Sequence, residues 1–171
     1  MTLRLILIRH AKSSWDNPAG DDHTRVLNDR GRASATALAG WLADNGYVPG
    51  QVFCSDAART HGTLGLILPV WPDARVAYRH DLYHASPDRM LMVLHRATAP
   101  VVALIGHNPG AAMLASGLVA KPPVHPRFAD FPTGAVAVID FDGAEWETAQ
   151  PGQGRAVDFV VPRDLIGGNA D

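Results

Sequence analysis

An apolar run near the beginning of the chain, Leu3-Arg4-Leu5-Ile6-Leu7-Ile8, ends at the polar pair Arg9-His10. A nearly continuous run of this kind is typical of a strand buried on both faces of a parallel sheet. The polar pair is then predicted to lie at the carboxyl end of that strand.

A second apolar run repeats the arrangement in the middle of the chain. Residues 100–105 (PVVALI) are followed by Gly106-His107-Asn108-Pro109. Asn108 can cap a helix and Pro109 can open it, which predicts a helix over residues 110–119. A histidine therefore follows each of two predicted buried strands.

Helices and short strands alternate between these two runs. After a loop at residues 16–22, Asn28 or Asp29 can cap a helix that stops near Gly46. A strand at 51–54 precedes a helix capped by Ser55 or Asp56, which carries Arg59 in its first turn and breaks at Pro69. A short strand at 75–78 and a helix from Ser86-Pro87 to about residue 95 follow.

The last third of the chain is less regular. Residues 121–133 contain four prolines and no periodicity, so we predict a loop there. Residues 135–141 and 156–160 are predicted as late strands. The whole pattern predicts a three-layer α/β/α sandwich with a mostly parallel sheet and a possible antiparallel edge. A length of 171 residues fits a single domain over residues 1–171.

Composition excludes several classes of function. The formal net charge of −2 gives no basic field for nucleic acid or anionic lipid, and the tryptophans do not interleave with basic residues. No segment is long and apolar enough for a signal peptide or a membrane span, so we expect no membrane association. Cys54 is the only cysteine, which excludes an intramolecular disulfide and favours the cytoplasm.

Three polar clusters are expected to meet at the carboxyl edge of the sheet, where open α/β sheets bind ligands. They contribute Arg9 with His10, Arg59, and His107. Such a set of hydrogen-bond donors suits a tetrahedral dianion such as phosphate better than a metal ion. Either His10 or His107 could attack phosphorus, while a protonated His107 could also serve as an electrostatic clamp.

The motifs around these residues resemble those of the histidine phosphatase superfamily, whose fold is phosphoglycerate-mutase-like. The main ones are residues 7–13 (LIRHAKS), 55–60 (SDAART) and 106–109 (GHNP), supported by 27–31, 82–83 and 131–134. Within that superfamily the sequence is most similar to the SixA-type phosphohistidine phosphatases. The resemblance covers nearly the whole chain.

The resemblance implies a metal-independent phosphatase without a cofactor, in which His10 is the phosphorylated nucleophile. Arg9, Arg59 and His107 would bind the phosphoryl group, with Ser13 close to it. The expected substrate is phosphohistidine on a signalling or phosphotransfer protein. Two alternatives stay open: a phosphatase of small phosphate monoesters, and a non-catalytic module that binds phosphoanions.

Three positions depart from the pattern of larger relatives. Ala11 replaces a glycine, as in SixA-type members, and Asp16 stands where an asparagine often helps to bind phosphate. The acid is the third departure, because Asp81 stands in place of a glutamate. An aspartate with a pKa near its ordinary value of about 3.9 is ionised at neutral pH, so Asp81 is only a provisional proton donor.

Two further patterns invite a metal assignment, and we set both aside. Residues 80–84 (HDLYH) imitate a zinc-binding spacing but precede a helix, so the two histidines need not share a face. Residues 21–23 (DDH) read more simply as capping and turn residues. Buried Cys54 is predicted to be a small core residue.

Overall fold

The computed structural model describes residues 1–17 and 19–167. Within them, a six-stranded sheet has the order β3-β2-β4-β1-β5-β6. The strands are β1 Thr2–Arg9, β2 Gln51–Ser55, β3 Arg75–Arg79, β4 Val101–Gly106, β5 Val136–Asp142 and β6 Arg155–Val160. Strands β1 to β4 pair in parallel with one another, whereas β5 pairs antiparallel with β1 on one side and with β6 on the other. The predicted mostly parallel sheet with an antiparallel edge is confirmed.

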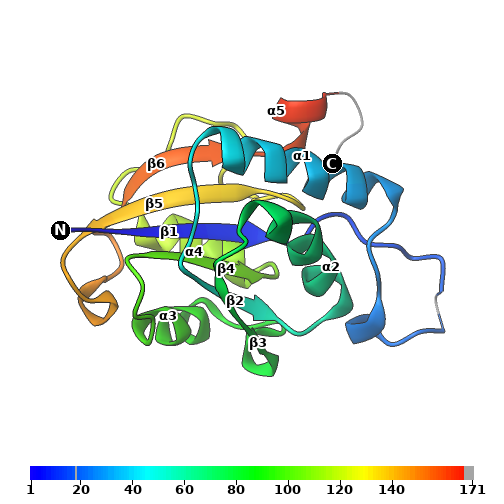
Figure 1. The fold of residues 1–171 in the computed structure, drawn as a ribbon, viewed down its shortest axis with the longest axis horizontal. Coiled ribbons are helices and arrows are strands. Elements are labelled where there is room, and N and C mark those ends of the chain that lie inside the picture. Colours follow the sequence, from blue (N-terminus) through cyan, green and yellow to red (C-terminus); the bar gives the residue numbers. More distant parts are fainter. Residues whose placement is uncertain (18, 168–171) are drawn as a thin grey trace.

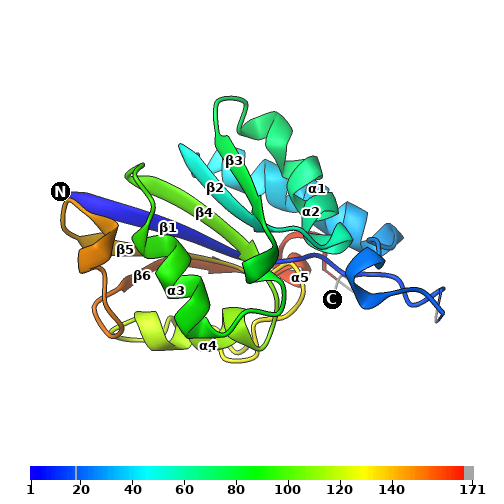
Figure 2. The same ribbon diagram turned by 90° about the horizontal axis from the view of Figure 1, so that it is seen from below.

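Helices cover both faces of this sheet (Figures 1 and 2). One face carries α1 (Asp29–Asp44), α2 (Ala58–Ile67) and the short α5 (Pro162–Ile166), while α3 (Pro87–His95) and α4 (Gly110–Leu118) pack on the other. Short 3-10 turns complete the described elements: η1 Asp22–Thr24, η2 Leu68–Val70, η3 His80–Leu82 and η4 Trp146–Thr148. The three-layer α/β/α sandwich predicted from the alternation of elements is therefore confirmed.

Strand β1 lies in the middle of both hydrophobic cores. Leu5 and Leu7 pack in the core beneath α3 and α4, whereas Ile6 and Ile8 pack in the core beneath α1 and α2. All four side chains are completely buried. Because successive strand residues face opposite sides of a sheet, only a continuous apolar run satisfies both cores.

The starts of two helices differ from the prediction. Ala57, rather than Ser55 or Asp56, is the N-cap of α2, and the Ser55 hydroxyl instead accepts a hydrogen bond from the Ala57 amide at 3.3 Å. Pro109 is the N-cap of α4, although Asn108 still accepts a hydrogen bond from the Ala112 amide at 3.1 Å. Each boundary thus lies one or two residues from the predicted one, which is within the usual range for helix ends.

Helix α5 was not predicted, because five residues are too few to display helical periodicity. Residues 121–133 form turns without helix or extended strand, as expected.

No helix in the described ranges combines the length and the apolar character that crossing a bilayer requires.

The first turn of α1 packs closely against the segment that follows β1. A methyl group on Gly31 would lie 2.0 Å from the Lys12 carbonyl oxygen, whereas one on Gly40 in the same helix would meet open space. We expect Gly31→Ala to lower the free energy of unfolding by about 1–3 kcal/mol, the usual effect of overpacking. The control Gly40→Ala should raise it by up to about 1 kcal/mol through helix propensity. Urea denaturation measures both; equal effects of the two variants would contradict this packing.

Candidate active site

A cavity of about 260 Å³ lies at the carboxyl ends of β1 and β4. Its lining combines arginine, histidine and small polar side chains from several loops. The lining residues are Arg9, His10, Lys12, Ser13, Trp15, Arg25, Arg59, His84, His107, Asn108 and Thr133. Four of the five residues predicted to be catalytic are among them. A larger hollow of about 920 Å³ lies around Met1, Met92 and Trp146 and contains none of these four.

The register of the sheet brings the two candidate histidines together. Arg9 of β1 pairs with Gly106 of β4, so His10 and His107 are the next residues of two adjacent parallel strands. Their ring centroids are 5.4 Å apart. The two strand ends that look alike in the sequence therefore lie side by side in the folded chain.

Arg9 and His10 both face the cavity because β1 stops between them. The His10 amide donates to the Gly106 carbonyl at 3.1 Å, and the Gly134 amide donates to the His10 carbonyl at 2.9 Å. The Arg9 guanidinium donates to the Phe131 carbonyl at 3.2 Å. The loop 121–133 thereby supplies a contact that orients one of the predicted phosphate-binding arginines.

His10 is a buried imidazole whose surroundings favour the neutral form. Its side chain is held by a 2.7 Å hydrogen bond between Nδ1 and the Ala11 carbonyl, to which a ring N–H donates. Burial, together with the positive charges of Arg9 and Arg59, lowers the pKa of His10 to about 3 despite that hydrogen bond. A tautomer with the proton on Nδ1 leaves the Nε2 lone pair available for reaction.

His107 is also neutral in the protein alone. Burial is the main cause, and the neighbouring His10 and Arg59 contribute to lowering its pKa to about 2. Its Nε2 lies 2.8 Å from the Ser55 hydroxyl oxygen. In the protein alone, burial and the neighbouring Arg59 therefore oppose the protonated form of His107 that the role of an electrostatic clamp would use.

Arg59 enters the cavity from the first turn of α2, and only 1% of its surface is exposed. It donates to the Asp22 carbonyl oxygen at 2.8 Å and to the Asp22 carboxylate at 3.0 Å. The Tyr83 hydroxyl donates to the same carboxylate. This hydrogen bond is the largest of several interactions that hold the pKa of Asp22 far below its ordinary value, so Asp22 is an ionised anchor for Arg59.

Three buried nitrogen atoms in the cavity region have no hydrogen-bond partner in the described structure: Arg9 Nε, Arg59 Nε and His107 Nδ1. A buried polar atom without a partner typically costs about 1–3 kcal/mol. An anionic ligand with several acceptor oxygens would satisfy such atoms. The donor set therefore fits a phosphoryl group, as the sequence predicts.

Ser13 lies where the sequence places it, and its neighbour Arg25 was missed. Ser13 is buried, lines the cavity and accepts a hydrogen bond from the Arg25 guanidinium. Arg25 also packs over the Trp15 ring at 3.8 Å from the centroid. Arg25 belongs to an irregular loop where periodicity carries no information, so only its contacts in the folded chain reveal it.

Asp81 is not positioned as expected. Its carboxylate forms two hydrogen bonds with the Arg79 guanidinium, at 2.9 and 2.7 Å, and it is absent from the cavity lining. These hydrogen bonds are the main reason why its pKa is lowered. A carboxylate stabilised in its ionised form is a poor proton donor, so the structure argues against Asp81 as the acid.

His84 occupies the cavity instead, although the sequence reasoning did not select it. Its Nε2 lies 3.0 Å from the Asp22 carboxylate and 3.4 Å from an Arg59 nitrogen, and its ring is 5.0 Å from that of His107. The backbone of His84 has a φ of 50°, which is costly for a residue other than glycine. Its place after β3, the parallel edge strand next to β2, was the available signal in the sequence.

Two arginines and two adjacent histidines at the carboxyl edge of an α/β sheet suit the binding of a phosphoanion. Residues 5–86 match the family model of the histidine phosphatase superfamily (branch 1). The chain is also 33% identical to an uncharacterised protein of Mycobacterium tuberculosis over 163 residues, covering 91% of this chain and all of the other. The chain belongs to the histidine phosphatase superfamily, and this membership supports phosphatase activity.

Solved structures refine this placement. A structure assigned as the phosphohistidine phosphatase SixA of Agrobacterium tumefaciens has a TM-score of 0.81 and 28% identity, covering 94% of this chain and 98% of that one. A second, assigned as SixA of Nakamurella multipartitia, has a TM-score of 0.77 and 29% identity, with coverage of 95% and 97%. The resemblance to SixA-type proteins and the phosphoglycerate-mutase-like fold are confirmed.

The low pKa of His107 predicts a specific dependence of stability on pH. An unfolded histidine takes up a proton near pH 6.5, whereas folded His107 does so near 2, so folding loses stability as the pH falls below about 6.5. Each such group adds a slope of up to about 1.4 kcal/mol per pH unit. We expect His107→Asn to flatten the dependence of the unfolding free energy on pH between 6 and 5. Exposed His61→Asn is the control, and equal slopes in wild type and His107→Asn would contradict the assignment.

Proposed function

We propose that this protein is a phosphatase that works through a covalent phosphohistidine on His10 and needs no metal for the reaction. The observation that carries the proposal is the His10 imidazole, buried, neutral and fixed through Nδ1 to the Ala11 carbonyl. A ring held in this way offers its Nε2 lone pair in one direction. That is the arrangement an imidazole nucleophile requires.

The proposed reaction has two steps. In the first, Nε2 of His10 attacks phosphorus while the bond from phosphorus to the leaving group breaks, which gives phosphorylated His10. In the second, water attacks the same phosphorus and the phosphorus–nitrogen bond breaks, which releases inorganic phosphate and free His10. Each step develops negative charge on the three equatorial phosphoryl oxygens.

Arg9, Arg59 and His107 are proposed to stabilise that charge. Arg59 is already oriented by Asp22, and Arg9 by the Phe131 carbonyl, so little reorganisation is needed when the phosphoryl group binds. A dianion beside His107 would favour its protonated form and oppose the effect of burial on its pKa. Ser13, held by Arg25, is proposed as a further group that contacts the phosphoryl oxygens.

We propose phosphohistidine on a partner protein in the cytoplasm as the substrate. Two structures at 28–29% identity that are assigned as phosphohistidine phosphatases support this choice. The exposed Trp15 ring supports it as well, because it lies on the rim of the cavity with 73% of its surface exposed. Exposed aromatic side chains of this kind are frequent anchors in contacts between proteins. Small phosphate monoesters are the competing substrate class.

His84 is proposed as the proton donor to leaving groups that need one, in place of Asp81. It lies beside the cavity cations and is hydrogen-bonded to Asp22, whereas Asp81 is paired with Arg79. An alkoxide leaving group depends strongly on such a donor. The imidazole that leaves a phosphohistidine depends on it less.

A trapping experiment tests the covalent intermediate. Brief exposure of the protein to a radiolabelled phosphodonor in the presence of EDTA, followed by denaturation, should give a protein phosphate that is stable in alkali and labile in acid. His10→Ala should carry no label. His61→Asn, which alters an exposed histidine, should be labelled like the wild type.

Three results would count against the proposal. Label that persists in His10→Ala would exclude His10 as the nucleophile. Loss of label in EDTA would contradict metal independence. Binding of phosphate without turnover of para-nitrophenyl phosphate would favour the non-catalytic module.

A comparison of leaving groups tests the substrate class and the role of His84. We expect kcat/KM for a phosphohistidine-bearing protein to exceed that for alkyl phosphates. His84→Gln should lower kcat for the alkyl phosphates by about 10²-fold or more, the usual contribution of a general acid, with little change for phosphohistidine. Higher kcat/KM for an alkyl phosphate would favour the small-molecule alternative, and equal losses on both substrates would exclude His84 as a donor specific to poor leaving groups.

A further inference from the structure

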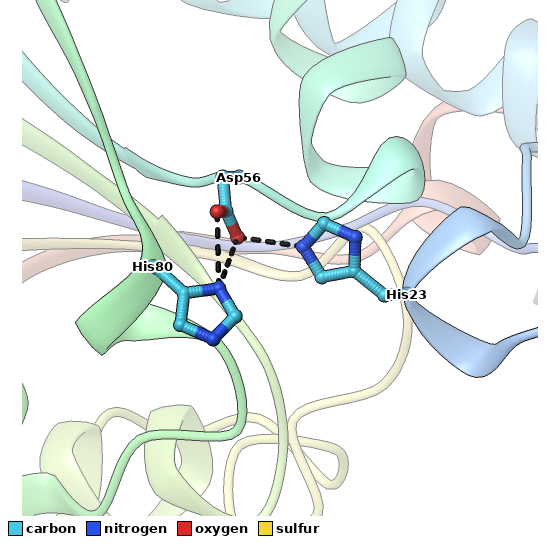
Figure 3. Close-up of side chains that lie close together, drawn as sticks. All are labelled: His23, Asp56 and His80. Carbon is cyan, nitrogen blue, oxygen red and sulfur yellow. Dashed lines mark hydrogen bonds and ion pairs between the residues drawn. The ribbon is translucent and has the colours of Figure 1, made fainter.

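Three potential metal ligands meet just outside the candidate active site. His23 comes from η1, Asp56 from the turn between β2 and α2, and His80 from η3 (Figure 3). His23 Nε2 lies 2.7 Å from Asp56 Oδ1, and His80 Nδ1 lies 3.1 Å from Asp56 Oδ2. Each of the three side chains offers one possible ligand atom, and these atoms all lie within 4.8 Å of one another.

The ring of Tyr83 holds this cluster in place. It makes an edge contact with His23 at 4.8 Å between centroids and a tilted contact with His80 at 5.8 Å. The exposed fractions of the side chains are 29% for His23, 32% for Asp56 and 75% for His80. The cluster therefore packs against the Tyr83 ring and is most accessible to solvent at His80.

We propose that His23, Asp56 and His80 form a binding site for a divalent transition-metal ion, with zinc as the best match. Imidazole nitrogen suits zinc, nickel and copper, whereas calcium and magnesium prefer sites made of oxygen alone. Tetrahedral zinc with bonds of about 2.0–2.1 Å to nitrogen and oxygen separates its ligand atoms by roughly 3.4 Å. The two separations from Asp56, 2.7 and 3.1 Å, lie within about 0.7 Å of this spacing, and no two of the three ligand atoms are more than 4.8 Å apart.

The charge state of the cluster also suits a cation. Aspartate is ionised at neutral pH, and the Asp56 carboxylate lies within hydrogen-bond distance of both histidine rings. The carboxylate is thus an anionic ligand at neutral pH. Three protein ligands leave the fourth tetrahedral position for water or another small ligand.

This site is separate from the proposed reaction. Its three ligands are absent from the lining of the cavity that contains His10 and His107. The two sites are nevertheless neighbours, because Tyr83 also contacts the His107 ring at 5.4 Å and Asp22 precedes His23 in the chain. Metal binding at this position needs no participation of the phosphoryl-binding groups.

Metal titration tests the site directly. Isothermal titration of the chelator-treated protein with zinc in phosphate-free buffer should show one site. Cobalt(II) in its place should give the visible absorption of a tetrahedral complex with nitrogen and oxygen ligands. Zinc should also raise the melting temperature by several degrees, since it binds the folded chain, whereas magnesium and calcium should not.

Matched variants decide where the metal binds. His80→Ala changes an exposed side chain and should weaken zinc binding by at least about 30-fold, as should Asp56→Asn. His125→Gln is the control, because His125 lies 2.9 Å from the Asp164 carboxylate but outside the cluster of His23, Asp56 and His80. This variant should bind zinc like the wild type. His10→Ala should also retain binding. Absence of zinc binding in the wild type, undiminished binding in His80→Ala, or loss in His10→Ala would overturn the proposal.

Discussion

The pairing of Arg9 with Gly106 across two parallel strands is the constraint on which the candidate site depends. It sets β1 beside β4 in a register that brings His10 and His107 out at the same height. The apolar residues of β1 enforce this arrangement, because they are buried on both faces and a shift of one residue would exchange the two faces. Packing in the core thus determines the distance between two histidines outside it.

The electrostatics of the site follow from the same placement. Burial opposes protonation of both histidines, and the positive charges of Arg9 and Arg59 add to this effect at His10, as that of Arg59 does at His107. The imidazoles are therefore neutral, which suits a nucleophile. Asp22 and the Phe131 carbonyl supply acceptors for the two guanidinium groups, and the remaining unpaired nitrogens of these groups suit phosphoryl oxygens.

Loops that follow β2 and β3 give the rim of the site its character. They carry Asp56, His80 and His84 close to η1, which carries Asp22 and His23. Tyr83 lies among these residues and contacts the rings of His23, His80 and His107. One aromatic side chain on the rim therefore lies between the proposed phosphoryl-binding cavity and the proposed metal site.

The linear sequence was sufficient for the sheet, for most helices and for the convergence of Arg9, His10, Arg59 and His107, because periodicity, capping residues and strand-end motifs are local signals. Only the folded chain shows that Asp81 pairs with Arg79 and that His84 lies in the cavity. It alone also shows that His23, Asp56 and His80 lie close together. Residues 21–23 and 80–84 each contain one histidine of that cluster, and neither segment alone predicts a partner. Contacts between distant loops, and the choice of Arg79 as the partner of Asp81, are properties of three-dimensional packing. Protonation states belong to the same class, since burial sets the pKa of His107.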